Sequence, residues 1–337
     1  MDLLLTGGMG YIGSHAAVVL TQAGHRVVLY DNLSNSAQVM VERLERITGV
    51  PTLFVDGDVR DTDRLRHTLR HHAIEAVIHF AGLKVVGESL DIPLDYYANN
   101  VQGSISLLQA MQEVGTRALV FSSSANVYGE PRYLPVDEAH PTGVTNPYGR
   151  TKLQVEEILH DLARSDPAWR IVCLRYFNPV GAHESGLIGE NPHGIPNNLM
   201  PYIAQVATGE LAELRVFGND YPTLDGTGVR DFIHVMDLAE GHASAVGYLR
   251  EHAGWQVINL GTGQGYSVLE MIRAFEAASG RRVPYRIAPR RPGDSASCYA
   301  NPEKARRVLN WTARRTLAQM CATTWAFHSG AGGKGAA

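Results

Sequence analysis

A glycine-rich turn directly after a short apolar segment constrains the possible folds of this chain most strongly. Residues 3–6 (Leu-Leu-Leu-Thr) have the composition of a buried strand, and an apolar pattern predicts a helix from about Ser14 to Leu20. Gly7, Gly10 and Gly13 lie between the two. Glycines in this context let the backbone approach a diphosphate at the amino end of the helix. Because glycine alone often merely ends a strand, the strand–turn–helix context carries the prediction.

An acidic residue at the end of the next expected strand strengthens this interpretation. Residues 26–30 form that strand, and Asp31 closes it 18 residues after Gly13. A carboxylate at this position suits the two hydroxyls of an adenosine ribose. The residues that follow contain no arginine, which favours NAD over NADP; they are Asn32, Leu33, Ser34 and Asn35. The amino-terminal part of the chain is therefore predicted to bind NAD.

Strands and helices continue to alternate along the first half of the chain. Residues 52–55 and 76–80 read as strands, with a polar helix expected near residues 61–72 between them. This order predicts an α/β fold with a doubly wound parallel sheet. In such a sheet, residues at the carboxyl ends of strands meet the ligand. The candidates for contacts with adenine and the diphosphate are Asp58, Val59, Phe80, Ala81, Gly82 and Lys84.

A tyrosine and a lysine four residues apart form the candidate catalytic pair. Pro147 suits a helix entrance, and a helical apolar pattern continues to about Leu159, so Tyr148 and Lys152 would project from one face. A lysine ammonium beside a phenol favours the phenolate and lowers its pKa from about 10, which gives a base usable near neutral pH. The alternative is a surface tyrosine beside a solvated lysine. Lysine is scarce, with 4 residues against 26 arginines, so its use at position 152 invites a functional reason.

A serine-rich strand end supplies a candidate partner for Tyr148. A helix is expected over residues 93–114, and the strand that follows, residues 118–121, runs into Ser122 and Ser124. Hydroxyl groups at the carboxyl end of a core strand face the ligand crevice of a doubly wound sheet. Ser124 is therefore a candidate proton-relay partner, whereas Ser122 also fits a role in satisfying backbone groups at the strand end.

The overall composition excludes several classes of protein. The chain has 337 residues, 45% hydrophobic and 19% charged, with a net charge of −4, as expected for one large globular domain or two closely joined ones. Without a basic run, nucleic acid and anionic membranes are poor candidate partners. Cys173, Cys298 and Cys321 fit a reducing cytoplasm and offer no metal-ligand spacing. The first apolar segment is too short for a signal peptide or a membrane span.

Long loops rich in Gly, Pro and Asn mark the second half of the chain as a binding region. They cover residues 178–198 and 217–229, and loops of this length are more often binding surfaces than idle connections. Arg230 and Arg291 could clamp a diphosphate through their planar guanidinium groups, although Arg230 beside Asp231 also fits a surface ion pair.

The histidines are weak catalytic candidates. None has an orienting neighbour in the sequence, and solvated or core positions explain them as well; those considered are His71, His72, His79, His183, His193 and His234. The tail from Ser329 onward is glycine-rich and is expected to be disordered.

Taken together, the glycine turn, Asp31, the serine strand end and the Tyr148–Lys152 pair resemble the extended short-chain dehydrogenase/reductase family. Longer strings carry the likeness over nearly all of residues 2–328 and are far more specific; they cover residues 79–89, 175–182, 194–202, 217–223 and 225–238. Within the family, the likeness is to the branch that epimerises UDP-hexoses at C4. The resemblance implies a Rossmann-type doubly wound parallel sheet with a smaller mixed α/β substrate-binding domain.

The resemblance also implies roles for individual residues. It implies a catalytic group made of Tyr148, Lys152 and Ser124. The expected NAD-binding residues are Gly7, Gly10, Tyr11, Ile12, Gly13, Asp31, Asn32, Leu33, Ser34, Asn35, Ser36, Asp58, Val59, Phe80, Ala81, Gly82, Lys84, Asn99, Ser122, Ser124, Tyr148, Lys152 and Phe177. The expected substrate-binding residues are Ser124, Tyr148, Asn178, Asn198, Leu199, Arg215, Val216, Phe217, Arg230, Arg291, Asp294 and Cys298.

The activity implied by this resemblance is NAD-dependent interconversion of UDP-galactose and UDP-glucose. It proceeds by reversible hydride transfer at sugar C4 through a 4-keto intermediate. The expected domains are residues 1–176 for NAD, to which the chain returns around 230–262, and mainly 177–328 for the UDP-sugar. A homodimer through the helices at 93–114 and 148–164, located in the cytoplasm, is also expected by resemblance.

Three positions bear on the choice among related activities. Dehydratases of the family carry an acidic pair just after the hydroxyl residue, whereas Ala125 and Asn126 stand there, which disfavours dehydration. Asn126 also replaces the Thr usual in these epimerases. Cys298 occupies a position where family members have either a bulky tyrosine or a small residue. A small residue leaves room beside the sugar C2 substituent, so UDP-N-acetylhexosamines are further candidate substrates, unless the change only affects packing.

Two alternative functions stay open from the sequence. One is an epimerase or decarboxylase of another UDP-sugar. The other is a redox-inert NAD-binding regulatory protein, against which the intact Tyr148 and Lys152 argue.

Overall fold

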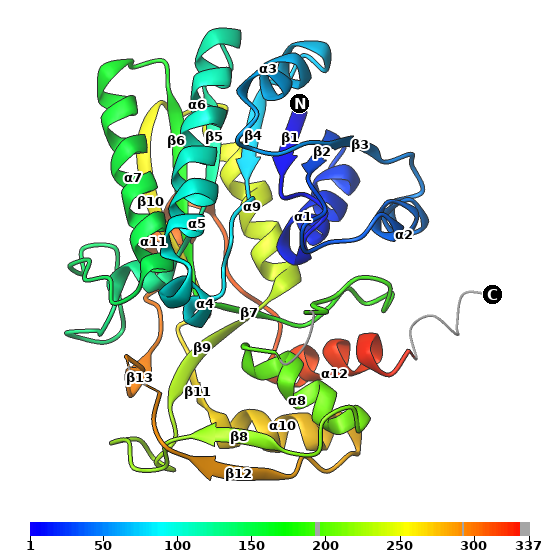
Figure 1. The fold of residues 1–337 in the computed structure, drawn as a ribbon, viewed down its shortest axis with the longest axis vertical. Helices are drawn as coiled ribbons and strands as arrows, with labels where there is room; N and C mark the ends of the chain where they lie inside the picture. Colours follow the sequence, from blue (N-terminus) through cyan, green and yellow to red (C-terminus); the bar gives the residue numbers. More distant parts are fainter. Residues whose placement is uncertain (193–195, 292, 331–337) are drawn as a thin grey trace.

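A parallel sheet with helices on both faces forms the upper half of the molecule in Figure 1. The structure, a computed structural model, describes residues 1–192, 196–291 and 293–330. In this part of the chain seven strands pair in the order β10-β6-β5-β4-β1-β2-β3. The strands are β1 (Asp2–Thr6), β2 (Arg26–Asp31), β3 (Leu53–Asp56), β4 (Ala76–His79), β5 (Ala118–Ser124), β6 (Arg170–Tyr176) and β10 (Gly254–Leu260). All neighbouring pairs are parallel, which confirms the predicted doubly wound sheet.

The two faces of the sheet bury separate apolar cores. Because side chains alternate across a strand, Leu3 and Leu5 pack into one core and Leu4 into the other. The helices of the first face are α1 (Tyr11–Gln22), α2 (Val39–Thr48), α9 (Val235–Leu249) and α11 (Glu303–Leu309). Those of the second face are α3 (Thr62–His71), α6 (Gly103–Val114) and α7 (Pro147–Ser165). Coverage on both faces explains why the strands read as continuous apolar runs.

The first residues of three helices show how the sequence sets their starts. Gly10, with extended backbone, is the N-cap of α1, so this helix begins at Tyr11, earlier than the predicted Ser14. The Asp61 side chain accepts a hydrogen bond from the Arg64 amide and begins α3. The Asn146 side chain accepts one from the Gly149 amide at the start of α7. This last cap lies next to the candidate catalytic tyrosine.

The helix expected over residues 93–114 contains a widened turn. The helical run begins with α4 (Val86–Asp91) and α5 (Pro93–Tyr96), continues as the π-helix η1 (Tyr97–Gln102), and passes into α6. Asn100 lies in this π-helix, and its side-chain amide donates to the Leu83 carbonyl at 2.9 Å and to Thr151 Oγ1 at 3.0 Å. Single π-helical turns recur at functional sites. Here the turn joins the loop after β4 to α7.

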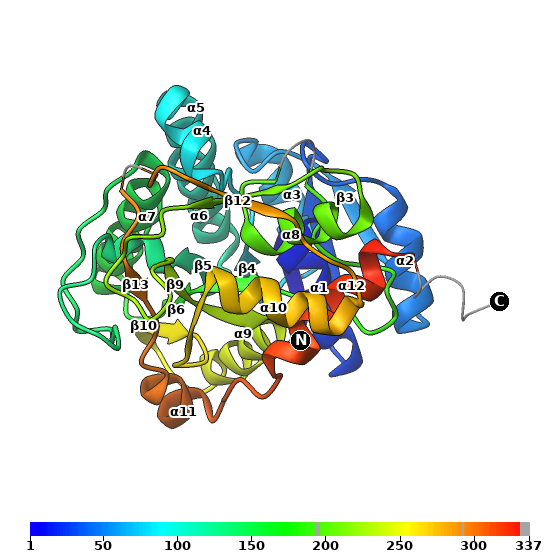
Figure 2. The same ribbon diagram turned by 90° about the horizontal axis from the view of Figure 1, so that it is seen from below.

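A smaller mixed α/β unit forms the lower half of Figure 1. One of its sheets contains β7 (Asn178–Val180), β9 (Val229–His234), β11 (Gly265–Ser267) and β13 (Ser297–Cys298). The other pairs β8 (Leu214–Phe217) in parallel with β12 (Tyr285–Ala288). The helices are α8 (Leu199–Thr208), α10 (Val268–Ser279) and α12 (Leu317–His328), which lie in front of the large sheet when the molecule is seen from below (Figure 2). The fold class predicted from the sequence is confirmed.

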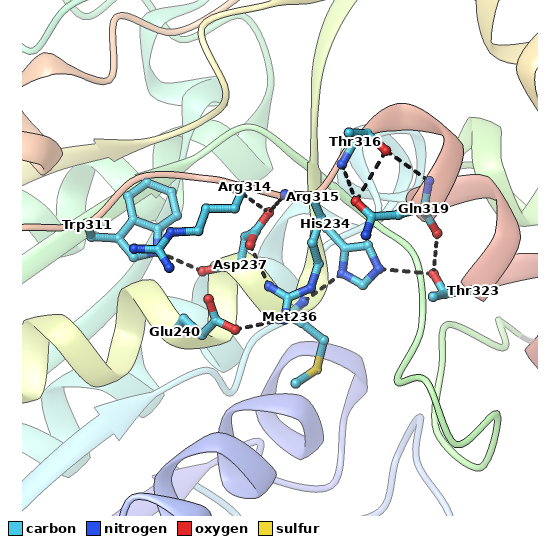
Figure 3. Close-up of polar contacts among 10 residues, drawn as sticks. All are labelled: His234, Met236, Asp237, Glu240, Trp311, Arg314, Arg315, Thr316, Gln319 and Thr323. Atoms are coloured by element: carbon cyan, nitrogen blue, oxygen red, sulfur yellow. Dashed lines mark hydrogen bonds and ion pairs between the residues drawn. The ribbon is translucent and has the colours of Figure 1, made fainter.

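The chain crosses between the two halves more than once. After β9 it returns through α9 to β10, which pairs with β6 from Gly254 opposite Arg170 to Leu260 opposite Tyr176. A polar cluster then fixes the carboxyl-terminal segment to α9 (Figure 3). In it, the fully buried Asp237 accepts hydrogen bonds from the Arg314 and Arg315 amides and from the Arg315 guanidinium. The tail was expected to be disordered from Ser329 onward; Ser329 is the C-cap of α12, and the residues beyond Gly330 lie outside the described residues.

Candidate active site

Tyr148 and Lys152 lie on one buried face of α7, at the carboxyl end of β5. Tyr148 is 8% exposed and Lys152 is 5% exposed, so neither is the solvated surface residue of the alternative interpretation. Lys152 Nζ donates a hydrogen bond to the Ser122 carbonyl at 2.8 Å. Ser124, the last residue of β5, lies close enough to Tyr148 that its hydroxyl lowers the pKa of the phenol. The three candidate catalytic residues are thus brought together.

The electrostatics of this group differ from the expectation in one respect. We expected Lys152 to lower the pKa of Tyr148, but burial raises it, and the groups that oppose the rise are Ser124, through its hydrogen bond, and Lys84, through its charge. Burial also lowers the pKa of Lys152 to about 8, against the opposing charge of Glu156. Lys152 donates its hydrogen bond to the Ser122 carbonyl at the strand end. The cation that favours the phenolate is Lys84.

The turn between β1 and α1 has the geometry of an anion cradle. Gly7 has φ +68°, and a Cβ on it would lie 2.6 Å from the Ala81 amide nitrogen. A Cβ on Gly13 would lie 2.4 Å from the Gly7 carbonyl oxygen. Only glycine fits at these two positions, and the closely packed turn presents the amino end of α1. These residues therefore fit the diphosphate of a dinucleotide. Tyr11, the first residue of α1, donates to the Gly181 carbonyl at 2.7 Å, and Ile12 packs against the core.

The acid at the end of β2 orders the loop that follows it. Asp31 Oδ2 accepts from the Met9 amide at 3.0 Å, and Oδ1 accepts from the Leu33 amide at 2.9 Å and from Ser36 Oγ at 3.1 Å. A carboxylate offers about four acceptor positions, so Asp31 can still accept from a ribose. Asn32, Ser34 and Asn35 are exposed in the same loop. The loop therefore stays open to a ligand.

Asp58 and Val59 take different environments just after β3. Asp58 accepts from the Arg60 guanidinium and from Asn32 Nδ2, and the Arg60 hydrogen bonds lower its pKa to about 2. Val59 is buried, and a Cβ on Gly103 would lie 2.8 Å from its Cγ2. Asp58 is therefore available at the surface, whereas Val59 fixes the helix packing beneath it.

The loop after β4 lies between the glycine turn and α7. The Ala81 amide bonds to the Thr6 carbonyl, and the Gly82 Cβ position lies 3.6 Å from Lys152 Nζ. Phe80 stacks obliquely against His242 at 4.8 Å between ring centroids. Lys84 Nζ donates to Glu190 Oε1 at 2.9 Å. This loop thus brings Gly82 and Lys84 to the Tyr148–Lys152 group.

Three further candidate NAD residues occupy the walls of the site. Asn99 donates through Nδ2 to Asn100 Oδ1 at 3.0 Å within the π-helix. The Ser122 hydroxyl pairs with the Tyr176 hydroxyl, so its side chain bonds to another side chain in the core and not to the strand-end backbone groups that the alternative named. Phe177 is buried in a small cluster with Tyr128 and Ala300 and has Ala125 and Cys298 packed around it.

The candidate substrate residues lie below the strand ends. Asn178 donates to the Asp231 carbonyl at 2.9 Å, and Asn198 donates to Glu190 Oε1 at 2.8 Å. Arg230 lies 3.8 Å from Asp294, and both are partly exposed. Asp231, the ion-pair partner of the alternative interpretation, is buried and accepts from Thr262 instead. The Arg291 guanidinium lies over the Phe217 ring at 3.8 Å from its centroid.

Two substrate candidates face inward. In β8, Val216 is 1% exposed and packs in the core of the lower half, so its side chain cannot contact a ligand; Arg215 on the opposite face is exposed. Leu199, the first residue of α8, also packs against that core. Leu199 is only partly buried, so its side chain is not excluded from a contact as that of Val216 is.

Cys298 lies beside Arg230 at the edge of the substrate region. β13 pairs with β9 so that Cys298 is opposite Arg230. Its side chain packs against the cluster that contains Phe177, and burial raises the pKa of the thiol to about 11. The thiol is therefore neutral and small.

Asn126, the residue that replaces the usual Thr, contacts the candidate catalytic serine. Its backbone amide and its side-chain amide both donate to Ser124 Oγ, at 3.2 and 3.0 Å.

The sequence interpretation missed four residues that build the site. Glu190 accepts from Lys84 and Asn198, Asn100 joins the loop after β4 to α7, and Asn146 begins α7. Glu156 lies one turn beyond Lys152 and forms a buried ion pair with Arg175 at 2.5 Å. A periodic spacing of four from Tyr148 through Lys152 to Glu156 could have suggested the last of these. Glu190 carries no such signal, because it lies in an irregular loop.

The histidines behave as structural residues. His79 hydrogen-bonds Thr6 Oγ1 and Ser104 Oγ in the core, and burial lowers its pKa to about 3. His234 is the N-cap of α9. His193 lies outside the described residues. Across residues 1–192, 196–291 and 293–330, no group of three His, Cys, Asp or Glu could hold a metal ion, and no helix is long and apolar enough to cross a membrane.

Comparison with known proteins agrees with this geometry. A family model described as GDP-mannose 4,6 dehydratase matches residues 4–324. UDP-glucose 4-epimerase of Bacillus subtilis (strain 168) is 56% identical over 329 residues, 98% of this chain and 97% of that protein. The crystal structure of UDP-glucose 4-epimerase from Stenotrophomonas maltophila, with bound NAD and formylated UDP-arabinopyranose, matches with a TM-score of 0.97 at 56% identity and covers 99% of both chains. A less similar structure, the UDP-Glc/GlcNAc 4-epimerase from Campylobacter jejuni, matches with a TM-score of 0.85 at 34% identity and covers 98% of this chain and 99% of that one. The chain belongs to the UDP-glucose 4-epimerases of the extended short-chain dehydrogenase/reductase family.

Proposed function

We propose that this chain interconverts UDP-galactose and UDP-glucose with NAD as its bound cofactor. The observation that carries the proposal is the buried group of Tyr148, Lys152 and Ser124 next to the glycine turn. A group of this kind needs no metal to move a proton. The relatives named above carry the same activity in their names.

The NAD site is proposed to extend from the glycine turn to α7. Gly7, Gly10 and Gly13 would hold the diphosphate, Asp31 the adenosine ribose, and Lys152 the other ribose; the remaining candidate residues of the first half would line the site. When bound, NAD accepts a hydride from sugar C4 and later returns it, so that no net oxidation occurs. The residues of this chain bind, orient and move the proton.

Tyr148 is proposed to be the general base and acid of the reaction. Its phenol oxygen takes the proton of the sugar 4-hydroxyl as C4 is oxidised to a ketone, and gives it back when C4 is reduced on the opposite face. Ser124 lowers the pKa of the phenol and would share the hydroxyl of the sugar. Because burial raises the pKa of Tyr148, the phenolate needs nearby positive charge, which Lys84 supplies. Inversion at C4 requires the keto sugar to turn over within the site.

The UDP group is proposed to be held firmly so that the hexose can turn. Arg230 and Arg291 would contact the diphosphate, and Asn178, Asn198 and Phe217 the rest of the nucleotide or sugar. The guanidinium groups suit a diphosphate because they present paired donors. Val216 would contribute its backbone groups, since its side chain is packed inward, and Leu199 lies at the start of α8 against the same core.

UDP-N-acetylhexosamines are proposed as further substrates. Cys298 supports this extension because its small, neutral side chain lies beside Arg230 among the residues around Phe177. The similarity to a structure named as a UDP-Glc/GlcNAc 4-epimerase supports it as well.

The assembly is proposed to be a homodimer in the cytoplasm. Leu90 and Leu94, four residues apart on α4 and α5, are 62% and 79% exposed next to the helices expected at the interface. An exposed apolar pair of this kind suits contact with a second chain. Residues 1–176 and the return at 230–262 are proposed as the NAD-binding domain, and residues 177–328 mainly as the UDP-sugar-binding domain.

The test is to mix the purified chain with UDP-galactose, without added NAD, and to measure UDP-glucose by chromatography. We expect formation of UDP-glucose, and release of NAD from the denatured protein. The variant Tyr148→Phe should retain NAD and lose nearly all turnover. Bound NAD without turnover of any UDP-sugar would support a regulatory protein instead. Full activity of Tyr148→Phe would reject the role of the phenol.

A further inference from the structure

Glu190 joins two residues that the proposed function gives to different ligands. It lies in the loop between β7 and α8 and is 8% exposed. Its Oε1 atom accepts a hydrogen bond from Lys84 Nζ at 2.9 Å and another from Asn198 Nδ2 at 2.8 Å. One oxygen atom thus keeps the lysine and the asparagine within two hydrogen-bond lengths of each other.

The carboxylate is the fixed member of this trio. The Lys84 side chain is 48% exposed, whereas that of Glu190 is 9% exposed. The loop before Glu190 is tied down, because Ala182 pairs with Gly189 and a Cβ on Gly189 would lie 2.6 Å from the Phe327 ring. Ile188 is fully buried in the core of the large sheet. An anchored, buried carboxylate therefore orders two side chains that would otherwise move freely in solvent.

The two partners behave as expected if Glu190 orders them. Asn198 is the N-cap of α8, yet among the described residues its side chain makes no cap hydrogen bond and donates to Glu190 instead. The charge of Glu190 raises the pKa of Lys84, so the lysine stays protonated beside it. Lys84 in turn lies 5.9 Å from the ring centroid of Tyr11 at the start of α1. The trio therefore connects the amino end of α1 to the amino end of α8.

We propose that Glu190 is a positioning residue that couples the NAD site to the UDP-sugar site by holding Lys84 and Asn198 on one carboxylate oxygen. The proposal rests on the proposed function for the roles of Lys84 and Asn198. It predicts that loss of Glu190 weakens the binding of both ligands, through Lys84 for NAD and through Asn198 for the nucleotide.

The test consists of two double-mutant cycles, which combine Glu190→Ala with Asn198→Ala and with Lys84→Ala. The measured quantity in both is ligand binding, not turnover. NAD retention is measured as dinucleotide left after dialysis, and UDP affinity by calorimetry. We expect Glu190→Ala to weaken UDP binding about tenfold, the value of one lost hydrogen bond to a charged group, and to lower NAD retention. In a chain that already carries Asn198→Ala, the further change Glu190→Ala should alter UDP affinity by less than about twofold. In a chain that already carries Lys84→Ala, Glu190→Ala should not lower NAD retention further.

Two further variants separate positioning from folding. Glu190→Gln keeps an oxygen acceptor without charge, so it should restore UDP affinity through Asn198 but not NAD retention through Lys84. Glu184→Ala changes an exposed carboxylate of the same loop and should leave both measurements and the melting temperature as in the original chain.

The outcomes distinguish this proposal from the proposed function. Additive effects in both cycles, or unchanged binding in Glu190→Ala, would overturn the coupling even if the chain epimerises UDP-galactose. Coupled binding in a chain without turnover would leave the coupling standing and reject the epimerase. A chain that holds neither NAD nor UDP would overturn both.

Discussion

Lys152 is a buried lysine whose charge depends on pH in the range where the protein works. Burial lowers its pKa from the ordinary 10.5 to about 8. Because the protonated lysine is the form proposed to hold the ribose, turnover should fall as pH rises through about 8. The measurement is the pH dependence of kcat. A flat profile up to pH 10 would show that the charge of Lys152 is not needed.

Unfolding would not explain that loss of activity. Between pH 8 and 10.5 the unfolded chain still binds the proton that folded Lys152 has released. Stability rises with pH wherever the unfolded state binds more protons, so the free-energy cost of burying this lysine falls across the same window. A melting temperature followed over these pH values therefore serves as the control.

Cys298 offers a second test at the level of one residue. Cys298→Tyr adds a large ring beside Arg230, in the region around Phe177. We expect turnover of UDP-N-acetylgalactosamine to fall at least tenfold while turnover of UDP-galactose changes by less than about threefold. These figures correspond to roughly 1.4 and 0.6 kcal/mol of transition-state free energy. If the original chain never turns over the acetylated sugar, the proposed extension is wrong.

Single residues were predictable where a regular spacing or turn marks them. Tyr148 and Lys152 follow the helical period, and Gly7 and Gly13 lie at positions where a Cβ would collide with backbone. Glu190 and the inward direction of Val216 were not predictable. Glu190 lies far from Lys84 in the sequence, and the face of a short strand is set by the helices that pack on it.

At the level of elements, caps link helix stability to the catalytic site. Asn146 begins α7 and Asp61 begins α3, each by accepting from a backbone amide. Replacing either by Ala should lower the free energy of unfolding by about 1 kcal/mol. Only Asn146→Ala should also lower kcat, because its helix carries Tyr148. Urea unfolding and kcat of both variants check this. If the Asn146→Ala and Asp61→Ala variants have the same kcat, the cap at Asn146 does not determine the position of the Tyr148 phenol.

The order of elements was predictable, but their fine geometry was not. Alternating apolar segments gave the parallel sheet, and the run from Pro93 to Val114 is helical as expected. The π-helical turn of residues 97–102 inside this run escaped prediction. An apolar period cannot show a turn that is held by the side chain of Asn100 and its long-range bonds to Leu83 and Thr151.

At the level of the whole molecule, the polar cluster of Figure 3 holds the carboxyl-terminal segment on α9. Asp237 is fully buried and accepts from three donors of Arg314 and Arg315. Asp237→Ala should lower the free energy of unfolding by about 3 kcal/mol, since it leaves these donors unpaired. Urea unfolding followed by tryptophan fluorescence measures it. The control is Glu303→Ala, which removes an exposed carboxylate paired with Arg306. Such exposed pairs contribute about 0–1 kcal/mol, so an equal loss of unfolding free energy in this variant would contradict the reasoning.

The position of β10 has a consequence for synthesis of the protein. Until residue 254 has left the ribosome, β6 has an unpaired edge of amide and carbonyl groups, and its neighbours in the nascent chain are all on one side. The large sheet of the nascent chain therefore stays one strand short of completion until then. An open strand edge favours aggregation, so that interval is where we expect the growing chain to be most prone to it.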